Sequence, residues 1–232
     1  MQAIDRRSRF DRRSGGSGRR PLPPHPRPCT GRLSTGEERP RRTDAEVMAD
    51  DGLLTAALVE SQRLGMLGAR PIGDVIAHAD AFVDALGPVH GRVVDLGTGG
   101  GIPGLVIAAR RPDLHLVLVD RRATRADHVA RLVRRFGWGD RVEVRAADAD
   151  TLIAAGDRFD GVVARSFGPP AVTLTTAAAL LAPGGRAVVS EPPPDTPRQW
   201  DDEVLRRLGL TQIRTSASPV AIFTHVSRET SR

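Results

Sequence analysis

Residues 93–104 read VVDLGTGGGIPG, in which a short apolar run is followed by a turn that contains five glycines. Glycine permits tight turns and a close approach of the backbone to a ligand. Gly99, Gly101 and Gly104 match the G-x-G-x-x-G pattern of dinucleotide-binding enzymes, in which a helix N-terminus faces a pyrophosphate. A dehydrogenase is therefore the first hypothesis to test.

The glycine turn belongs to a regular alternation of strand-like and helix-like segments. Strands are predicted over 92–96, 114–120, 141–147, 159–167 and 186–192, helices over 103–111, 122–137, 170–185 and 199–209, and a final antiparallel pair over 211–217 and 220–227. This order predicts an α/β fold with a mostly parallel, doubly wound sheet and an antiparallel final strand. In such sheets the ligand binds at the carboxyl ends of the strands, where this turn lies.

Two further regions precede this alternation. Residues 51–88 carry apolar residues at helical spacing and predict two or three short helices, so that 46–90 forms a small helical lead-in to a domain over 91–232. Residues 1–45 are rich in Arg, Pro, Gly and Ser and predict a disordered tail. That tail is interpreted either as an arginine-rich arm for RNA phosphates or as a solvated leader.

Two acidic residues bear on the cofactor class: Asp95 discriminates between the classes, whereas Asp120 fits either of them and has an alternative interpretation as a turn residue. Asp95 stands inside the turn, two residues before Gly97, where a carboxylate would repel a pyrophosphate but would suit a positively charged ligand such as S-adenosylmethionine. Asp120 ends the second predicted strand, where an acid accepts hydrogen bonds from ribose hydroxyls. The run is similar to the first motif of class I S-adenosylmethionine-dependent methyltransferases, which implies their Rossmann-like fold.

The fourth predicted strand narrows the reaction. Methyltransferases that act on exocyclic amines usually carry Asp/Asn-Pro-Pro-aromatic there, but this chain has Ala164-Arg165-Ser166-Phe167. The Pro-rich run at 191–194 follows the fifth strand and is misplaced for that role. The sequence therefore disfavours a reaction that needs a carboxylate or amide at this position.

A longer stretch carries a closer resemblance. Residues 95–120, with Ile102-Pro103-Gly104 in the turn, resemble the family of bacterial 16S rRNA guanine-N7 methyltransferases of the glucose-inhibited division protein B type. The segment 159–165 resembles a later motif of that family, and 64–68 together with His78 resembles its helical lead-in. The resemblance covers about residues 55–190.

The resemblance and the turn together imply a set of cofactor-binding residues for S-adenosylmethionine: Asp95, Gly97, Thr98, Gly99, Gly101, Ile102, Asp120, Ala149, Asp150 and Arg165. Arg165 is also expected to act in catalysis by positioning the cofactor or the base. Ile102 and Asp150 have structural alternatives, as a packing residue at a helix entry and as a turn former. Arg121, Arg122 and Arg125 are expected either to hold RNA phosphates or to form a solvated helix start.

The chain departs from the family pattern at Thr124, His128 and Asp148, and it contains no lysine. Two alternatives stay open. The near-neutral net charge of residues 46–232 leaves open a relative that methylates another RNA or a small molecule. The departures leave open a non-catalytic module that binds S-adenosylmethionine or RNA. The expected partner is 16S rRNA or the small ribosomal subunit, and the oligomeric state is left open.

Composition limits the other classes of function. Residues 1–45 hold 12 arginines against five acidic residues, a net charge of +7, whereas the whole chain has +6, so residues 46–232 sum to −1. The only cysteine is Cys29, which excludes an internal disulfide and a cysteine-based metal cluster. No run approaches the length of a membrane span, so the sequence predicts a cytoplasmic protein without a membrane or metal partner.

Overall fold

The computed structural model describes residues 44–192, 200–213 and 218–226. Residues 1–43 of the predicted tail lie outside them, whereas Asp44 and Ala45 begin the first helix. Its helices are α1 (Asp44–Arg63), α2 (Ile72–Leu86), α3 (Gly104–Arg110), α4 (Ala123–Arg135), α5 (Ala149–Ala154), α6 (Pro170–Leu180) and α7 (Asp202–Arg207). Its strands are β1 (Arg92–Leu96), β2 (His115–Asp120), β3 (Val142–Ala146), β4 (Phe159–Ala164), β5 (Leu181–Ser190), β6 (Leu210–Ile213) and β7 (Val220–His225).

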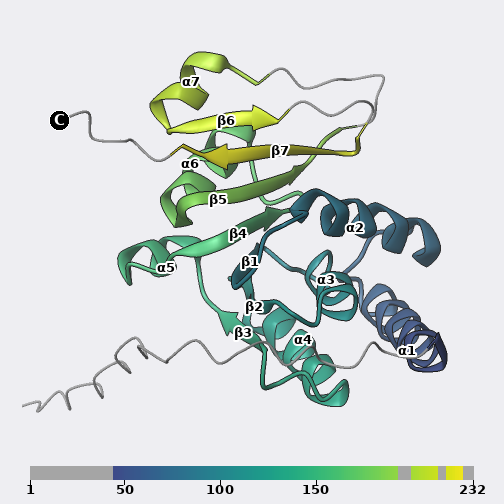
Figure 1. The fold of residues 1–232 in the computed structure, drawn as a ribbon. Helices are drawn as coiled ribbons and strands as arrows, with labels where there is room; N and C mark the ends of the chain where they lie inside the picture. Colours follow the sequence, from purple (N-terminus) through teal and green to yellow (C-terminus); the bar gives the residue numbers. More distant parts are fainter. Residues whose placement is uncertain (1–43, 193–199, 214–217, 227–232) are drawn as a thin grey trace, which may run out of the picture. The chain divides into compact units, whose positions relative to one another are not determined.

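The seven strands form one sheet in the order β3-β2-β1-β4-β5-β7-β6 (Figure 1). The first five of these run parallel, and β7 is antiparallel to both β5 and β6. The predicted fold class, with its antiparallel final strand, is therefore confirmed. The strand order reverses beside β1, whose neighbours are β2 and β4, so the end of β1 lies at the topological switch point where such sheets bind ligands.

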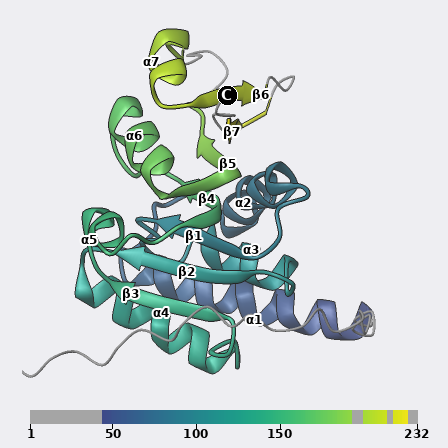
Figure 2. The same cartoon turned by 60° about the vertical axis from the view of Figure 1, so that its left-hand side comes forward.

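Two hydrophobic clusters cover the two faces of the sheet, because successive side chains of a strand point to opposite faces. Val93 and Leu118 pack with residues of α1, α2, α3 and α4, whereas Val94 and Leu96 pack with residues of α5, α6 and α7. Figures 1 and 2 show α1 to α4 on one side of the sheet and α5 and α6 on the other. The lead-in is thus part of one helical layer, and it consists of two helices joined by residues 64–71.

Three segments differ from the sequence prediction. The strand predicted over 159–167 ends at Ala164, because the chain turns at Ser166, where φ is 53°. The helix predicted over 170–185 ends at Leu180, because Pro183 cannot continue a helix, and Leu181 already starts β5 opposite Phe159. The short helix α5 was not predicted, since its six residues are too few to show a helical period. Helix α5 follows the carboxyl end of β3, and the early end of α6 lengthens β5, the strand beside β4.

His128, one of the departures from the family pattern, is buried in α4 and joined to Ser61 of α1. Its Nε2 lies 2.8 Å from the Ser61 hydroxyl, while its Nδ1 is buried without a hydrogen-bond partner. Burial lowers the pKa of His128, so the folded protein holds a neutral imidazole there. The departure therefore has a structural role, as a polar contact between two helices.

We expect Ser61→Ala to lower the free energy of unfolding by about 1–2 kcal/mol, because it leaves the buried imidazole without a partner. Thr55→Ala is the matched control, since Thr55 is exposed on the same helix. Denaturant unfolding of the two variants beside the unchanged protein measures the difference. Equal stability of Ser61→Ala and Thr55→Ala would show that the contact between α1 and α4 contributes nothing.

Candidate functional site

The glycine turn closes between the end of β1 and the start of α3. Gly99 adopts a φ of 59°, in the left-handed region that favours glycine, and its N–H is thereby directed at Asp120. Gly104 begins α3 in close contact with the strands, and a Cβ there would lie 2.7 Å from Oδ2 of Asp95 and would also overlap Leu118. The turn therefore needs glycine at both positions, for conformation at the first and for space at the second.

Asp95 lies under this turn and is only 1% exposed. Its Oδ2 accepts a hydrogen bond of 2.9 Å from the Gly104 N–H, which ties β1 to α3. The Thr98 hydroxyl lies beside the carboxylate, but the pair does not reach hydrogen-bond geometry, so Oδ1 of Asp95 and Oγ1 of Thr98 are both buried without a partner. Burial raises the pKa of Asp95 to about 6, against the opposing effects of Thr98 and Gly104.

Asp120, at the end of β2, holds the turn from the other side. Its Oδ2 accepts a hydrogen bond of 3.0 Å from the Gly99 N–H, and its Oδ1 accepts one of 2.9 Å from the Arg122 N–H. It is 5% exposed and lines a cavity at the carboxyl ends of the strands. Because each carboxylate oxygen has a second lone pair, Asp120 can still accept hydrogen bonds from a ligand.

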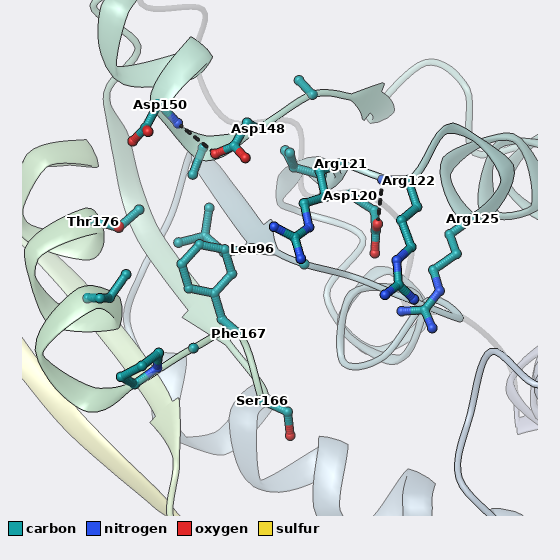
Figure 3. A pocket seen from close by; sticks show the side chains of 17 residues that line it. Leu96, Asp120, Arg121, Arg122, Arg125, Asp148, Asp150, Ser166, Phe167 and Thr176 are labelled. Carbon is teal, nitrogen blue, oxygen red and sulfur yellow. Dashed lines mark hydrogen bonds between the residues drawn. The ribbon is translucent and has the colours of Figure 1, made fainter.

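The cavity measures about 410 Å³, within the range of small-molecule sites. Its walls come from the ends of β1, β2 and β3 and from the segment that leads from β4 into α6 (Figure 3). Four of the predicted cofactor residues line it: Gly97, Asp120, Ala149 and Asp150. The structure thus brings together residues that lie up to 53 positions apart in the chain.

The other predicted residues do not line the cavity. Asp95 lies in β1 below the turn, Thr98, Gly99 and Gly101 form the turn itself, and Arg165 follows the last residue of β4 without lining the cavity. Ile102 is 3% exposed and belongs to the hydrophobic cluster under α1 to α4, which agrees with its alternative interpretation as a packing residue. Direct contacts of these residues with a cofactor stay predictions.

The departure at Asp148 has a local structural reason. Asp148 is the N-cap residue of α5, and its Oδ1 accepts a hydrogen bond of 3.3 Å from the Asp150 N–H (Figure 3). Aspartate is among the preferred N-cap residues because its side chain satisfies a helix N–H that has no partner within the helix. Ala149 and Asp150 therefore occupy the first turn of a helix at the cavity wall, and a contact of Asp150 with the cofactor stays a prediction.

The segment after β4 turns sharply at Ser166, whose φ of 53° is the only positive value among the described non-glycine residues. On one side of this turn Phe167 lines the cavity. On the other side Arg165 is half-buried, and no hydrogen bond or ion pair involving its side chain is found within the described residues. Burial and the nearby Arg70 lower the pKa of Arg165, while Asp95 opposes them.

His78 of α2 belongs to the same neighbourhood as Arg165. Burial lowers its pKa, and the positive charges of Arg165 and Arg70 lower it further. Its ring makes an edge contact with Phe82 of the same helix. His78 thus lies on the second helix of the lead-in, and its place near Arg165 did not follow from the sequence pattern.

These residues fit the methyl donor implied by the sequence. The fit rests on the orphaned Oδ1 of Asp95, which puts negative charge under the turn, where a sulfonium would be attracted. It rests also on Asp120, which offers acceptors to a ribose at the cavity wall.

Among the described residues, no group of three or more His, Cys, Asp or Glu side chains is arranged to hold a metal ion. No helix in the described ranges is long and apolar enough to cross a membrane.

Comparison with solved structures supports the fold. The described architecture resembles cofactor-bound Rv0187 from MTB, with a TM-score of 0.56 and 22% identity over 81% of this chain and 99% of that chain. It also resembles the T. thermophilus 16S rRNA N2 methyltransferase solved with AdoMet and guanosine, with a TM-score of 0.53 and 19% identity over 70% of this chain and 45% of that one. At these identities the likeness concerns the fold alone.

Comparison with known sequences identifies the family. Two proteins called ribosomal RNA small subunit methyltransferase G are similar to this chain. The one from a Nocardioides species is 40% identical over 45% of this chain and 44% of its own length. The one from Frankia casuarinae is 32% identical over 60% of this chain and 51% of its own length. The chain thus spans about half the length of the curated relatives that it matches. Residues 55–191 match the family described as rRNA small subunit methyltransferase G. The chain therefore belongs to the rRNA small subunit methyltransferase G family.

Proposed function

We propose that this protein is an S-adenosylmethionine-dependent methyltransferase that methylates guanine N7 in 16S rRNA. The observation that carries the proposal is the buried, half-unsatisfied carboxylate of Asp95 under a glycine turn that opens beside Asp120 and the cavity. A site of that charge suits a cofactor that bears a sulfonium and a ribose. Membership of the family supports the same reaction.

The cofactor, when bound, supplies an electrophilic methyl group on a positively charged sulfur. In this proposal Asp120 accepts hydrogen bonds from the ribose hydroxyls, and Asp150 borders the adenine. Gly97 lets the backbone approach the ligand closely at the cavity wall. Arg165 lies on the side of Asp95 and there positions the methionine end of the cofactor or the target base.

The end of β4 supports a reaction at a nitrogen that has no proton to lose. Guanine N7 carries a free lone pair, so its methylation needs no general base. Ala164 stands where amine methyltransferases carry an acid or amide, and the three residues after it, Arg165, Ser166 and Phe167, bear no carboxylate. Catalysis then depends on orientation and exclusion of water, and placement of reactants alone contributes about 7–11 kcal/mol.

Arginines near the cavity, exposed except for the half-buried Arg125, support an RNA substrate. Arg122 and Arg125 lie side by side beyond Asp120 in Figure 3, and Arg131 and Arg134 are exposed farther along α4. The side chains of Arg122 and Arg125 make no hydrogen bond or ion pair within the described residues. The net charge of −1 over residues 46–232 therefore conceals a local basic surface, and this weakens the argument for a small-molecule substrate.

The substrate is tested by mapping methylated nucleosides in 16S rRNA of a strain from which the gene has been deleted. We expect loss of one N7-methylguanine, restored by the gene but not by its Arg165→Ala form. Incubation of the purified full chain with deletion-strain small subunits and methyl-labelled cofactor should restore the same modification. An rRNA methylation profile that does not change on deletion would contradict the proposed substrate.

Asp95→Asn should separate stability from cofactor binding. Asparagine keeps an acceptor for the Gly104 N–H but removes a buried charge whose pKa is about 6 against an ordinary 3.8. Without cofactor at pH 8, we expect the variant to be more stable by up to about 3 kcal/mol, yet to bind S-adenosylmethionine poorly. The difference in the free energy of unfolding between the two proteins should narrow as the pH falls through 6 and close near pH 4. As the pH falls, Asp95 of the unchanged protein takes up its proton at a higher pH in the folded state than in the unfolded state, which removes the unfavourable buried charge. Denaturant unfolding across this range would refute the prediction if the variant were less stable at pH 8.

Cofactor affinity should depend on pH through the same carboxylate. As the pH falls below about 6, Asp95 gains a proton and the attraction for a sulfonium is lost. S-adenosylhomocysteine carries a neutral sulfur, so its affinity should change less than that of S-adenosylmethionine. Calorimetric titrations at pH 5 and pH 8 with both ligands measure the contrast. An identical pH dependence for the two ligands would remove Asp95 from sulfonium binding.

A further inference from the structure

Three side chains at the carboxyl edge of the sheet offer hydrogen-bond donors outside the cavity. Arg165 follows β4, whose last residue pairs with Leu96 of β1, so Arg165 starts at the level of Gly97. His78 comes from α2, and Arg70 comes from the loop that precedes this helix. None of the three lines the cavity that is expected to take the adenosine of the cofactor. We call these three residues the basic cluster.

The members of the basic cluster act on one another through their charges. Burial is the main cause of the lowered pKa of both His78 and Arg165, and the charge of Arg70 lowers each further. Because charges in salt solution are screened over about 10 Å, such effects place the groups in one neighbourhood. Their side chains make no hydrogen bond or ion pair within the described residues. The folded protein thus holds these donors together without an acceptor.

The loop between α1 and α2 fixes the position of Arg70. The Gln62 side chain donates hydrogen bonds to the backbone carbonyls of Gly68, at 2.6 Å, and of Arg70, at 2.8 Å. Leu67 lies against the glycine turn, where a Cβ on Gly100 would come within 2.8 Å of the leucine side chain. The loop is therefore attached both to the end of α1 and to the turn, and it keeps the backbone of Arg70 at the edge of the site.

The acid that acts on the basic cluster does not compensate its charge. Asp95 opposes the lowering of the pKa of Arg165, but it is 1% exposed and its Oδ2 already accepts from the Gly104 N–H. In contrast, Arg70 is exposed, and His78 and Arg165 are half-buried. Two guanidinium groups and an imidazole that remain accessible suit an anion with several acceptor oxygens, such as a phosphate.

A guanosine brings a phosphate to this place when its N7 faces the methyl group. In the usual anti conformation of a purine nucleotide, the edge that carries N7 lies toward the 5′ phosphate. The basic cluster lies on the side of Asp95, where the proposed function expects the sulfonium and its methyl group. A guanine whose N7 points at that methyl group therefore carries its own 5′ phosphate toward the basic cluster.

We propose that Arg70, His78 and Arg165 bind the 5′ phosphate of the target guanosine and thereby orient its N7 toward the methyl group. This inference rests on the proposed function, and it decides between the two roles allowed there for Arg165, because it assigns this residue to the substrate. Arginine offers paired N–H donors to phosphate oxygens, and a neutral imidazole adds one N–H. Gln62 is a positioning residue, since it holds the loop without touching the substrate.

Kinetics of methyl transfer to deletion-strain small subunits test the site. Arg70→Ala should lower kcat/KM for the subunits roughly tenfold, the scale of one hydrogen bond to a charged group. Its dissociation constant for S-adenosylhomocysteine should stay within about twofold of that of the unchanged protein. Arg207→Ala is the matched control for lost charge, because Arg207 is exposed on α7, which leads into the edge strand β6. Unfolding curves verify that each variant is folded.

Mononucleotides identify the phosphate that is bound. At saturating S-adenosylmethionine, guanosine 5′-phosphate should inhibit methylation of the subunits at millimolar concentration, roughly tenfold better than guanosine or guanosine 3′-phosphate. Arg70→Ala and Gln62→Ala should each reduce this preference, whereas Arg207→Ala should keep it. Equal inhibition of the unchanged protein by the three compounds, or no inhibition by the 5′-phosphate, would overturn the site.

Conservative variants separate the charge from the hydrogen-bond donor. Arg70→Lys keeps the cation and should retain most of the preference for the 5′-phosphate, because lysine binds phosphate as a point charge. His78→Gln keeps an N–H donor and should retain more of the preference than His78→Phe, which keeps only a ring. A full preference in His78→Phe would contradict the role of His78.

The outcomes distinguish this inference from the function on which it rests. If the unchanged protein does not methylate the subunits, the proposed function fails and the inference falls with it. If the protein methylates them and Arg70→Ala matches Arg207→Ala, only the phosphate site is wrong. If Arg70→Ala and His78→Phe weaken binding of S-adenosylhomocysteine instead, the basic cluster binds the carboxylate of the cofactor, and the assignment to the RNA phosphate is overturned.

Discussion

The hydrogen bond from the Gly104 N–H to Asp95 is the contact on which the site depends. It joins Asp95, near the carboxyl end of β1, to the first residue of α3, nine positions later in the chain. This contact lies where the strand order of the sheet reverses. The contact requires a glycine, since a side chain at position 104 would displace the carboxylate. It also requires an acceptor that is buried, and a buried carboxylate with one free oxygen is unfavourable. The folded protein thus holds the carboxylate of Asp95 in an unfavourable buried position, which a cation bound nearby would stabilise.

Asp120 extends this constraint to the second strand. By accepting from Gly99 and from Arg122, it fixes the glycine turn and the entry to α4 relative to each other. Arg121 lies between Asp120 and Arg122, so the backbone that holds Arg122 also determines the direction of Arg121. One carboxylate therefore orders the turn, faces the cavity and sets the side chains at its rim. Such support from residues behind the ligand is what keeps a site in its productive geometry.

The sequence predicted the fold well because the strands of a parallel sheet are buried and read as short apolar runs. β1 agrees with its predicted range, and Asp120 ends its strand as expected. The site was predicted in part: the turn and both acids were identified, but Ile102 packs inward and Asp95 braces the backbone below the cavity. Whether a residue of the turn lines the cavity or packs inward depends on which side of the turn its side chain faces. The spacing of residues in the sequence does not determine that side.

What the sequence could not supply came from non-local contacts. Phe167 lines the cavity, and the space for its ring depends on Gly97, 70 positions earlier in the chain. Position 128 departs from the family pattern, yet His128 is satisfied by Ser61 on another helix. Asp148 likewise departs and serves as a helix cap. These departures are therefore absorbed by packing and capping, and they give no support to loss of catalysis.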